Sequence, residues 1–252
     1  MSVSCSPLVL FCDFGLPYTG QMKARLHHGA PNHPIIDLFH DVPAHDVRAG
    51  SVLLAAHAGD FPPGSVFVCV VDPGVGTGQR KPGALHVGGR WFVGPLNGLF
   101  EHTLRRFEGS PVAAEAYEIT VLPDGLSASF HGRDLFAPVA AQIARGDLSS
   151  LSPLALDTVR EPSFADDVEA VIYSDGFGNL MTGIRAANLG AGDTLSLNGT
   201  VLPRRRTFGE VESGTLFCYE NAVGLMEIAA NRGDARAIVG VTGEITIKIM
   251  RM

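Results

Sequence analysis

The hydrophobic pattern of the chain changes character near residue 150, and this change constrains the fold more than any other feature. Before it, short apolar runs alternate with longer segments of helical periodicity. The apolar runs span residues 8–11, 35–38, 65–71 and 91–93, and the helical segments span 46–58 and 134–144, each starting at an acidic residue. Such alternation predicts an α/β domain with a largely parallel central sheet that helices cover on both faces.

The second half has shorter apolar runs that alternate or are β-branched, with Gly, Asn and Pro turns between them. They span residues 168–173, 194–197, 215–219, 237–241 and 244–249. This pattern is typical of a small antiparallel barrel or sandwich. Residues 151–167 are rich in Ser, Pro, Leu and Asp and lack clear periodicity, which indicates a linker. The prediction is therefore an α/β N-terminal domain (1–150), a linker (151–167) and a smaller all-β C-terminal barrel (168–252).

Composition excludes several classes of function. With 252 residues, 46% of them hydrophobic and 18% charged, the chain can bury one large core or two smaller ones. The net charge of -7 argues against a nucleic-acid surface, which needs clustered Lys and Arg. The sequence has neither a signal-peptide pattern nor an apolar run of about 18 residues, and its four cysteines lack Cys-x-x-Cys spacing. We therefore expect a cytoplasmic protein that does not associate with membranes.

Two loop segments combine glycine with acidic, basic and imidazole side chains. Residues 71–80 follow an apolar run, are rich in glycine and contain Asp72 and Arg80. Residues 129–134 read Ser-Phe-His-Gly-Arg-Asp and contain His131. Glycine lets the backbone approach a ligand closely, and loops on a rigid scaffold commonly carry functional side chains. The two loops therefore predict one site that combines a carboxylate, a guanidinium and an imidazole.

Three more segments complete an ordered set of five. They are Asp-Phe-Gly at 13–15, Asp-Gly-Phe-Gly-Asn at 175–179 and Asn-Ala-Val-Gly-Leu-Met-Glu-Ile-Ala at 221–229. In order and spacing, over nearly the whole chain, the five segments resemble the S-adenosylmethionine hydroxide adenosyltransferases, hydrolase relatives of the fluorinating and chlorinating enzymes that attack the same substrate. Five ordered segments are far more specific than any one of them.

The resemblance implies an α/β N-terminal domain and a β-barrel C-terminal domain. It also implies a homotrimer, with each active site between the N-terminal domain of one subunit and the C-terminal domain of the next. S-Adenosylmethionine would be the substrate, and no cofactor would be needed. A sulfonium is already a good leaving group, so the difficulty is to deliver a nucleophile in line with the bond to the ribose C5'.

Three residues would activate the nucleophile if that nucleophile is water. Water has a pKa of about 15.7, so a base or a positive charge must favour the developing hydroxide. The resemblance implies that Asp72 holds or deprotonates the water, that His131 shares the proton and that Arg80 stabilises the hydroxide. Taken alone, Asp72 could be a turn residue before proline and His131 an ordinary loop histidine.

The position of the arginine departs from the family pattern. In that pattern an arginine stands one residue closer to the aspartate, where this chain has Gln79. Either the loop has one inserted residue or the arginine has moved, and an Arg80 that cannot reach the water would leave a slow or inactive enzyme. The halogenating relatives lack the combination of acid and histidine that this chain keeps at Asp72 and His131, so water rather than halide is the favoured nucleophile.

The resemblance also implies roles in substrate binding for seven residues. These are Asp13 for the ribose hydroxyls, Asp175 and Asn179 for the amino-acid and nucleoside parts, Asn221 and the backbone near Ala222 for the adenine edge, Phe208 for an aromatic face, and Glu227 for an ammonium or ribose group. Structural roles compete with some of these. Asp13 could cap a helix, Asp175 and Asn179 suit turns, and a buried Glu227 could pair with an arginine.

Two other functions stay open at this point. One is a halide-dependent adenosyl transfer, and the other is a non-catalytic trimer that binds S-adenosylmethionine or adenosine. Departures from the family pattern at residues 16–23 and 95–98, near the expected ribose pocket, bear on substrate pose and rate. Six of the nine histidines fall between His27 and His57, but without the regular spacing of a zinc site, so no metal is expected.

Overall fold

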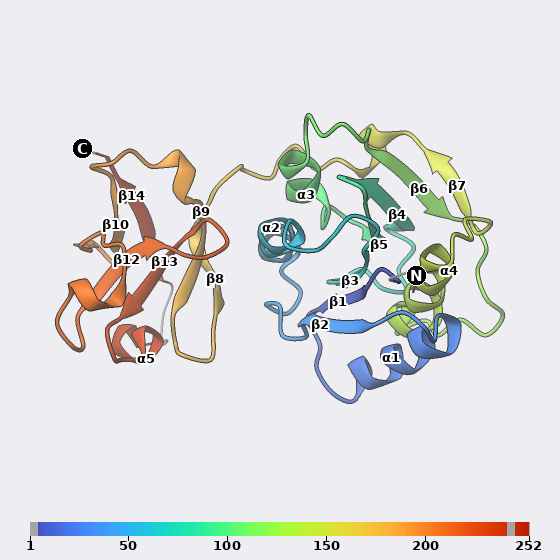
Figure 1. Ribbon diagram of the computed structural model, residues 1–252, viewed down its shortest axis with the longest axis horizontal. Helices are drawn as coiled ribbons and strands as arrows, with labels where there is room; N and C mark the ends of the chain where they lie inside the picture. Colours follow the sequence, from blue (N-terminus) through green and yellow to red (C-terminus); the bar gives the residue numbers. More distant parts are fainter. Residues whose placement is uncertain (1–4, 241–244, 252) are drawn as a thin grey trace. The chain divides into compact units, whose positions relative to one another are not determined.

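The computed structural model describes residues 5–240 and 245–251. The chain divides into two compact units (Figure 1), and the boundary along the sequence falls between Phe164 and Ala165. This boundary falls within the range 151–167 that the sequence analysis assigns to a linker. The first part of that range contains strand β7 (Leu151–Leu154) and a 3-10 turn (Leu156–Val159). Because β7 pairs with β6 (Glu115–Ile119), this part belongs to the sheet of the first unit.

The first unit is built on a seven-stranded sheet with the order β2-β1-β3-β5-β4-β6-β7. Its parallel strands are β1 (Leu8–Cys12), β2 (Ile35–Phe39), β3 (Val66–Val70) and β5 (Arg90–Leu96). Strand β4 (Lys81–Val87), β6 and β7 pair antiparallel with their neighbours. The sheet is therefore mixed, and the prediction of a largely parallel sheet is correct only for its first half. The glycines at 88 and 89, both with positive φ, form the tight turn that sets β4 and β5 antiparallel.

Helices lie on both sides of this sheet (Figure 1). They are α1 (Tyr18–Gly29), α2 (Val47–Ala58), α3 (Glu101–Arg106) and α4 (Ala137–Ala144), the last directly preceded by a π-helical turn (Gly132–Phe136). Figure 1 shows α2 and α3 on one side of the strands and α1 and α4 on the other. Leu8 and Leu10 of β1 share a buried cluster with Leu26 of α1 and Phe136.

The two predicted helices begin differently. Asp46 caps α2, since its Oδ1 accepts a hydrogen bond from the Ala49 N–H at 2.9 Å, and the helix predicted from this residue is confirmed. Asp134 does not cap a helix. It lies inside the π-helical turn and pairs with the neighbouring Arg133, so α4 starts three residues later than predicted.

A buried carboxylate anchors the segment that ends the first unit. Glu101 of α3 is completely buried and accepts hydrogen bonds from Arg105 (2.7 Å), Arg160 (2.9 Å) and the Glu161 N–H (2.7 Å). Burial alone would raise the pKa of Glu101, but the hydrogen bonds from Arg160, Glu161 and Arg105 outweigh it and lower this pKa to about 2. The ionised carboxylate therefore fastens residues 160 and 161 to α3.

Replacing Glu101 with glutamine is expected to lower the free energy of unfolding by about 3 kcal/mol at neutral pH, because the arginines lose a buried partner. Since the folded pKa lies below the ordinary value of 4.5, this contribution is present above pH 4.5 and is lost as pH falls toward 2. Urea titration measures the change. The matched control is Glu118→Gln, which removes a more exposed pair with Lys81 and should cost less than about 1 kcal/mol. Equal losses in the two variants would contradict the anchoring role.

The second unit contains two antiparallel sheets. One has the order β12-β13-β9-β8, with β8 (Val168–Ser174), β9 (Leu180–Arg185), β12 (Leu216–Glu220) and β13 (Leu225–Ala230). The other has the order β11-β10-β14, with β10 (Thr194–Leu197), β11 (Thr200–Val201) and β14 (Ile247–Met250). Both contribute to one buried cluster that includes Leu180, Leu195, Ile228 and Ile247. The antiparallel pairing is as predicted, and closure into a barrel stays a prediction.

One predicted strand of this unit is wrong. Residues 237–239 belong to a short helix, α5 (Ala235–Val239), whose N-terminus is capped by Asp234 through the Ala237 N–H at 2.8 Å. The cap and the small residues after it favour a helix, and they outweigh the β-branched residues on which the strand prediction rested. Val241 and Glu244, at the ends of the two predicted strands, lie outside the described residues.

The remaining short elements are two 3-10 turns, Ala186–Asn188 and Phe208–Glu210. Within residues 5–240 and 245–251, no helix has the length and apolar character that crossing a membrane requires.

Candidate functional site

Two carboxylates follow neighbouring parallel strands of the first unit. Asp13 comes directly after β1, and Asp72 comes two residues after the end of β3. The Asp13 N–H donates to the Val70 carbonyl at 3.2 Å, which ties the two strand ends together. Because ligands of α/β sheets bind beyond the carboxyl ends of the strands, this edge is where a site is expected.

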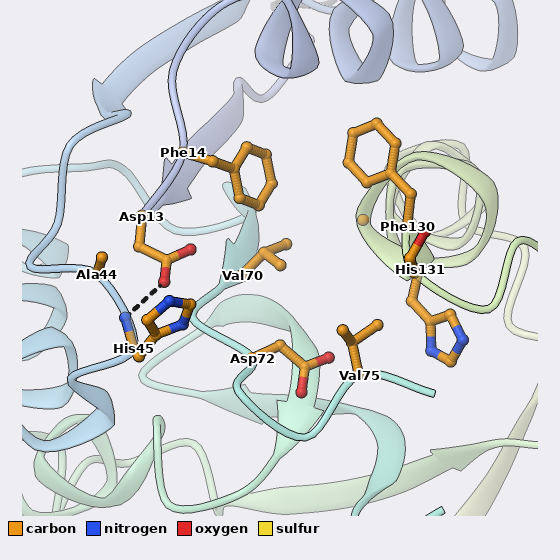
Figure 2. Close-up of a pocket in the computed structure, with 11 residues that line it drawn as sticks. Asp13, Phe14, Ala44, His45, Val70, Asp72, Val75, Phe130 and His131 are labelled. Atoms are coloured by element: carbon orange, nitrogen blue, oxygen red, sulfur yellow. Dashed lines mark hydrogen bonds between the residues drawn. The ribbon is translucent and has the colours of Figure 1, made fainter. Parts of the chain in front are cut away.

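A cavity of about 280 Å³ lies at this edge (Figure 2). Its lining includes Asp13, Phe14, His45, Asp72, Phe130 and His131. In Figure 2 Phe130 and His131 project from the segment opposite Asp13 and His45, with Asp72 between the two sides. Asp13, Asp72 and His131, all predicted from the sequence, are therefore brought together in one cavity.

Arg80 joins the other two predicted catalytic side chains. Its Nε donates to Asp72 Oδ1 at 3.0 Å, and its Nη2 donates both to Asp72 Oδ2 and to His131 Nδ1, the latter at 2.9 Å. The Arg80 and Asp72 side chains are only 7% and 3% exposed, so water screens this pair weakly. The guanidinium also lies over the Phe136 ring, 5.5 Å from its centroid. Arg80 thus reaches Asp72 despite the shifted spacing, and Gln79 is exposed.

The loop from Asp72 to Arg80 is built from tight turns. The Val75 and Thr77 N–H groups donate to the carbonyls of Asp72 and Gly74, and glycines at 76 and 78 adopt positive φ. A Cβ at Gly76 would lie 2.4 Å from the Ala128 carbonyl oxygen. Only glycine therefore allows this loop to pack against the segment that carries His131.

The hydrogen bonds determine the protonation of His131. An arginine can only donate, so the Nδ1 that faces Arg80 must accept, and the ring proton resides on Nε2. Burial lowers the pKa of His131 below its usual 6.5, and the positive charge of Arg80 lowers it further, against opposing effects of Asp72 and Asp134. The imidazole is therefore neutral at neutral pH.

Asp13 faces the cavity rather than capping a helix. Helix α1 begins at Tyr18, and its N-cap position is Pro17. The Oδ2 of Asp13 instead accepts a hydrogen bond from the His45 N–H at 2.9 Å, drawn in Figure 2. The His45 N–H thus fixes the orientation of the Asp13 carboxylate, which lines the cavity.

Tyr18 and Asn97 lie in the two stretches, 16–23 and 95–98, that depart from the family pattern. Tyr18 forms edge-to-face contacts with Phe14 and Phe130, with ring centroids 6.1 and 5.5 Å apart. The Asn97 side-chain amide donates to the Val71 carbonyl at 3.0 Å, next to the start of the loop that carries Asp72. Asn97 is the residue of its stretch that keeps the family pattern, whereas the departure there is Leu96.

In the second unit, Asp175 and Asn179 close the β8–β9 hairpin. Asp175 Oδ1 accepts from the N–H groups of Phe177 and Asn179, each at 2.9 Å, and its Oδ2 accepts from the Asn179 side chain at 2.9 Å. The turn role considered for both residues is therefore present. The hairpin carries Phe177 at its tip with 81% of its surface exposed.

Glu227 is buried and has internal partners. It accepts hydrogen bonds from the Tyr219 hydroxyl and from Asn221 Nδ2, the latter at 3.0 Å, so tyrosine and asparagine take the place of the arginine considered from sequence. Burial and the hydrogen bond to Glu227 raise the pKa of Tyr219. Asn221 Oδ1 accepts from the N–H groups of Val223 and Leu225 at 3.1 and 3.0 Å.

The side-chain amide of Asn221 is thus engaged inside the unit. The Phe208 ring packs edge to face on Phe217 and Tyr219, with centroids 5.2 and 5.4 Å apart. Two residues of interest, His45 and Tyr219, were not identified from sequence. Tyr219 lies opposite Glu227 in the β12–β13 pairing, but that register is visible only in the structure.

The histidine-rich stretch does not form a metal centre in the described part of the chain, where no three His, Cys, Asp or Glu side chains are arranged to hold an ion. His33 and His57 instead bond to the backbone carbonyls of Ser6 and Leu53, at 2.9 and 2.8 Å.

The chain matches two family models. Residues 8–152 match the SAM hydroxide adenosyltransferase N-terminal domain, and residues 169–248 match the C-terminal domain of the same family. A protein of Thermus thermophilus named (R)-S-adenosyl-L-methionine hydrolase is 36% identical over 97% of this chain and 99% of its own. A protein of Salinispora tropica with the same name is also 36% identical, over 91% of this chain and 92% of its own.

Solved structures are similar as well. An uncharacterized conserved protein from Thermotoga maritima has a TM-score of 0.77 at 31% identity, covering 97% of this chain and 100% of its own. A conserved hypothetical protein from Thermus thermophilus has a TM-score of 0.73 at 33% identity, with the same coverage. The similarity therefore extends over both units.

Proposed function

Because the chain belongs to the S-adenosylmethionine hydroxide adenosyltransferase family, we propose that it hydrolyses S-adenosyl-L-methionine to adenosine and L-methionine. The two relatives described above are named for hydrolysis of this substrate. The observation that carries the proposal is the hydrogen-bonded group of Asp72, Arg80 and His131, of which Asp72 and His131 line the cavity together with Asp13. These groups suit the activation of water next to a bound ribose.

Arg80 organises the water site. Its donors occupy one acceptor position on each Asp72 oxygen and the acceptor nitrogen of His131. A carboxylate oxygen has a second lone pair, so Asp72 can still accept a hydrogen bond from a water in the cavity. The guanidinium then places a positive charge beside the oxygen as hydroxide character develops. His131, neutral and protonated on Nε2, completes the polar surroundings of that water.

In the proposed step the water oxygen attacks the ribose C5' from the side opposite sulfur. A C–O bond forms as the C–S bond breaks, and the bonding electron pair returns to sulfur, which leaves as the neutral thioether of methionine. The water loses one proton, which Asp72 accepts and releases to solvent. The leaving group needs no acid, so the proposed reaction requires no cofactor. Attack on a cation neutralises charge, and the apolar Phe14, Val75 and Phe130 in the cavity favour that change.

Asp13 would accept hydrogen bonds from the ribose hydroxyls and so place C5' before Asp72. We further propose that Asp175, Asn179, Phe208, Ala222 and Glu227, with the backbone at Asn221, form the surface of the second unit that binds the rest of the substrate. A homotrimer with shared active sites, a closed C-terminal barrel and a cytoplasmic location are parts of the same proposal. The free state of all four cysteines supports a reducing compartment.

The proposal extends to the configuration at the substrate's sulfur atom. A sulfonium with three different substituents is chiral, and the names of the relatives specify the R form. We propose the same preference here. Incubation with separated R and S epimers, followed by chromatography of the nucleosides, tests both points. Adenosine from the R epimer supports the proposal, and no adenosine from either epimer overturns it. A chlorinated nucleoside formed in excess chloride would instead indicate the halogenase reaction.

Acid is expected to inactivate the enzyme through His131. Below its lowered pKa, His131 gains a proton on Nδ1, which turns the acceptor facing Arg80 into a donor and sets two positive charges against each other. Accordingly kcat/KM should be constant near pH 7 and fall as pH decreases below the usual histidine value of 6.5. A pH profile of the initial rate measures this limb. A rate that increases as pH falls through this range would contradict the neutral role of His131.

A further inference from the structure

The backbone at His45 adopts a conformation that is uncommon for residues other than glycine. Its φ is 65°, in the left-handed region, where a Cβ crowds the following carbonyl and glycine is favoured. The residue is exposed, so burial of its side chain does not compensate for the strain. Strain of this kind in a residue that lines a cavity points to a function for the residue.

The backbone and the ring of His45 do different things. The main-chain N–H donates to Asp13 Oδ2 at 2.9 Å, and a glycine would supply the same donor without strain. The imidazole lines the cavity and makes no hydrogen bond to any residue in the ranges that the structure describes. In Figure 2 the ring is drawn directly beside the Asp13 carboxylate, with the Asp72 carboxylate farther to the right. Support of Asp13 therefore does not explain why the residue is histidine.

We infer that His45 is a substrate-contacting residue that recognises the ribose, an inference that rests on the proposed function. With the ribose hydroxyls on Asp13 and C5' before Asp72, the sugar passes the edge of this imidazole. A ring N–H can donate to a ribose hydroxyl oxygen, while Asp13 accepts from the hydroxyl protons. His45 would then bind the oxygen of a ribose hydroxyl, and Asp13 would bind the hydroxyl protons. The hydrogen bond from the His45 N–H to Asp13 Oδ2 fixes the distance between the two residues.

Substitutions at position 45 separate ring from backbone. His45→Gly removes the ring, keeps the N–H donor and relieves the strain, so its melting temperature should not be lower than that of the wild type. Its Kd for adenosine should rise about fivefold for the loss of one hydrogen bond. His45→Asn tolerates the left-handed backbone and retains a donor, so it should recover most of the affinity. KM for S-adenosylmethionine should follow the Kd, with kcat nearly unchanged.

The experiment is calorimetric titration of the full chain and both variants with adenosine and with 2',3'-dideoxyadenosine, beside hydrolysis by the wild type. A loss in His45→Gly that is seen with adenosine and absent with the dideoxy compound supports the inference. Equal adenosine affinities of wild type and His45→Gly overturn it, as does an equal loss for both nucleosides. If the wild type binds adenosine without hydrolysing S-adenosylmethionine, the proposed function fails, and ribose recognition is still judged by the titrations.

Discussion

Replacing Asp72 with asparagine is expected to lower kcat for S-adenosylmethionine hydrolysis by about 10³-fold, the scale on which a general base contributes. An amide cannot take a proton from water, and its nitrogen would face a guanidinium that can only donate. Asp13 and the second unit are untouched, so KM should change much less than kcat. Steady-state assays of adenosine release at neutral pH provide both constants.

The matched control is Asp37→Asn, which neutralises an exposed carboxylate of β2 that pairs with Lys23 at 2.5 Å. Exposed pairs contribute less than about 1 kcal/mol, so this variant should keep wild-type kcat and nearly wild-type stability. Because Asp72→Asn leaves Arg80 in a buried position, its folding is checked by circular dichroism and adenosine binding. A folded Asp72→Asn variant with more than a tenth of wild-type kcat would contradict the role of Asp72.

The second large effect on kcat is expected from the position of the arginine, at residue 80 rather than 79. Arg80→Gln should lower kcat by about 10²- to 10³-fold, because it removes the positive charge beside the developing hydroxide. Adding Gln79→Arg to this variant restores the spacing of the family pattern. It should not restore activity, because the side chain at 79 is exposed while the one at 80 reaches Asp72 and His131.

Two readouts strengthen this comparison. Arg80→Lys keeps the positive charge but cannot form the bidentate hydrogen bonds to Asp72, so its activity should lie between those of wild type and Arg80→Gln. In Arg80→Gln the positive charge that lowers the pKa of His131 is gone, so the acid limb of the pH profile should move upward. Recovery of the double variant to within about tenfold of wild type would show that the loop can use either register.

Much of the first unit could be predicted because its parallel half is built from continuous apolar runs. The strands near β1, β2, β3 and β5 and helix α2 followed from that pattern and from the Asp46 cap. Strand β4 was missed because it begins Lys-Pro-Gly and carries polar residues on a partly exposed face. Its antiparallel direction is determined by the Gly88-Gly89 turn, a signal that is present in the sequence.

The members of the proposed catalytic group could be named from the sequence, but their hydrogen bonds and protonation states could not. Strand ends that meet at one edge bring Asp13 and Asp72 together, and the order of the segments pointed to His131. The contact of Arg80 with Asp72 depends on a loop in which Gly76 packs against Ala128. These two residues are far apart in the sequence, so no local sequence pattern predicts their contact. The tautomer of His131 and the strained backbone of His45 likewise depend on long-range contacts. The same holds for Glu227, whose partner Tyr219 is set by cross-strand register.

The origin of the new oxygen tests the central claim most directly. Wild-type enzyme is incubated with the R epimer of S-adenosylmethionine in heavy-oxygen water, and the products are analysed by mass spectrometry. Attack of water on C5' predicts the heavy isotope in the 5'-hydroxyl of adenosine and none in the sulfur-containing product, which is methionine. Unlabelled adenosine, or cleavage that releases methylthioadenosine, would contradict a water held by Asp72, Arg80 and His131 as the nucleophile.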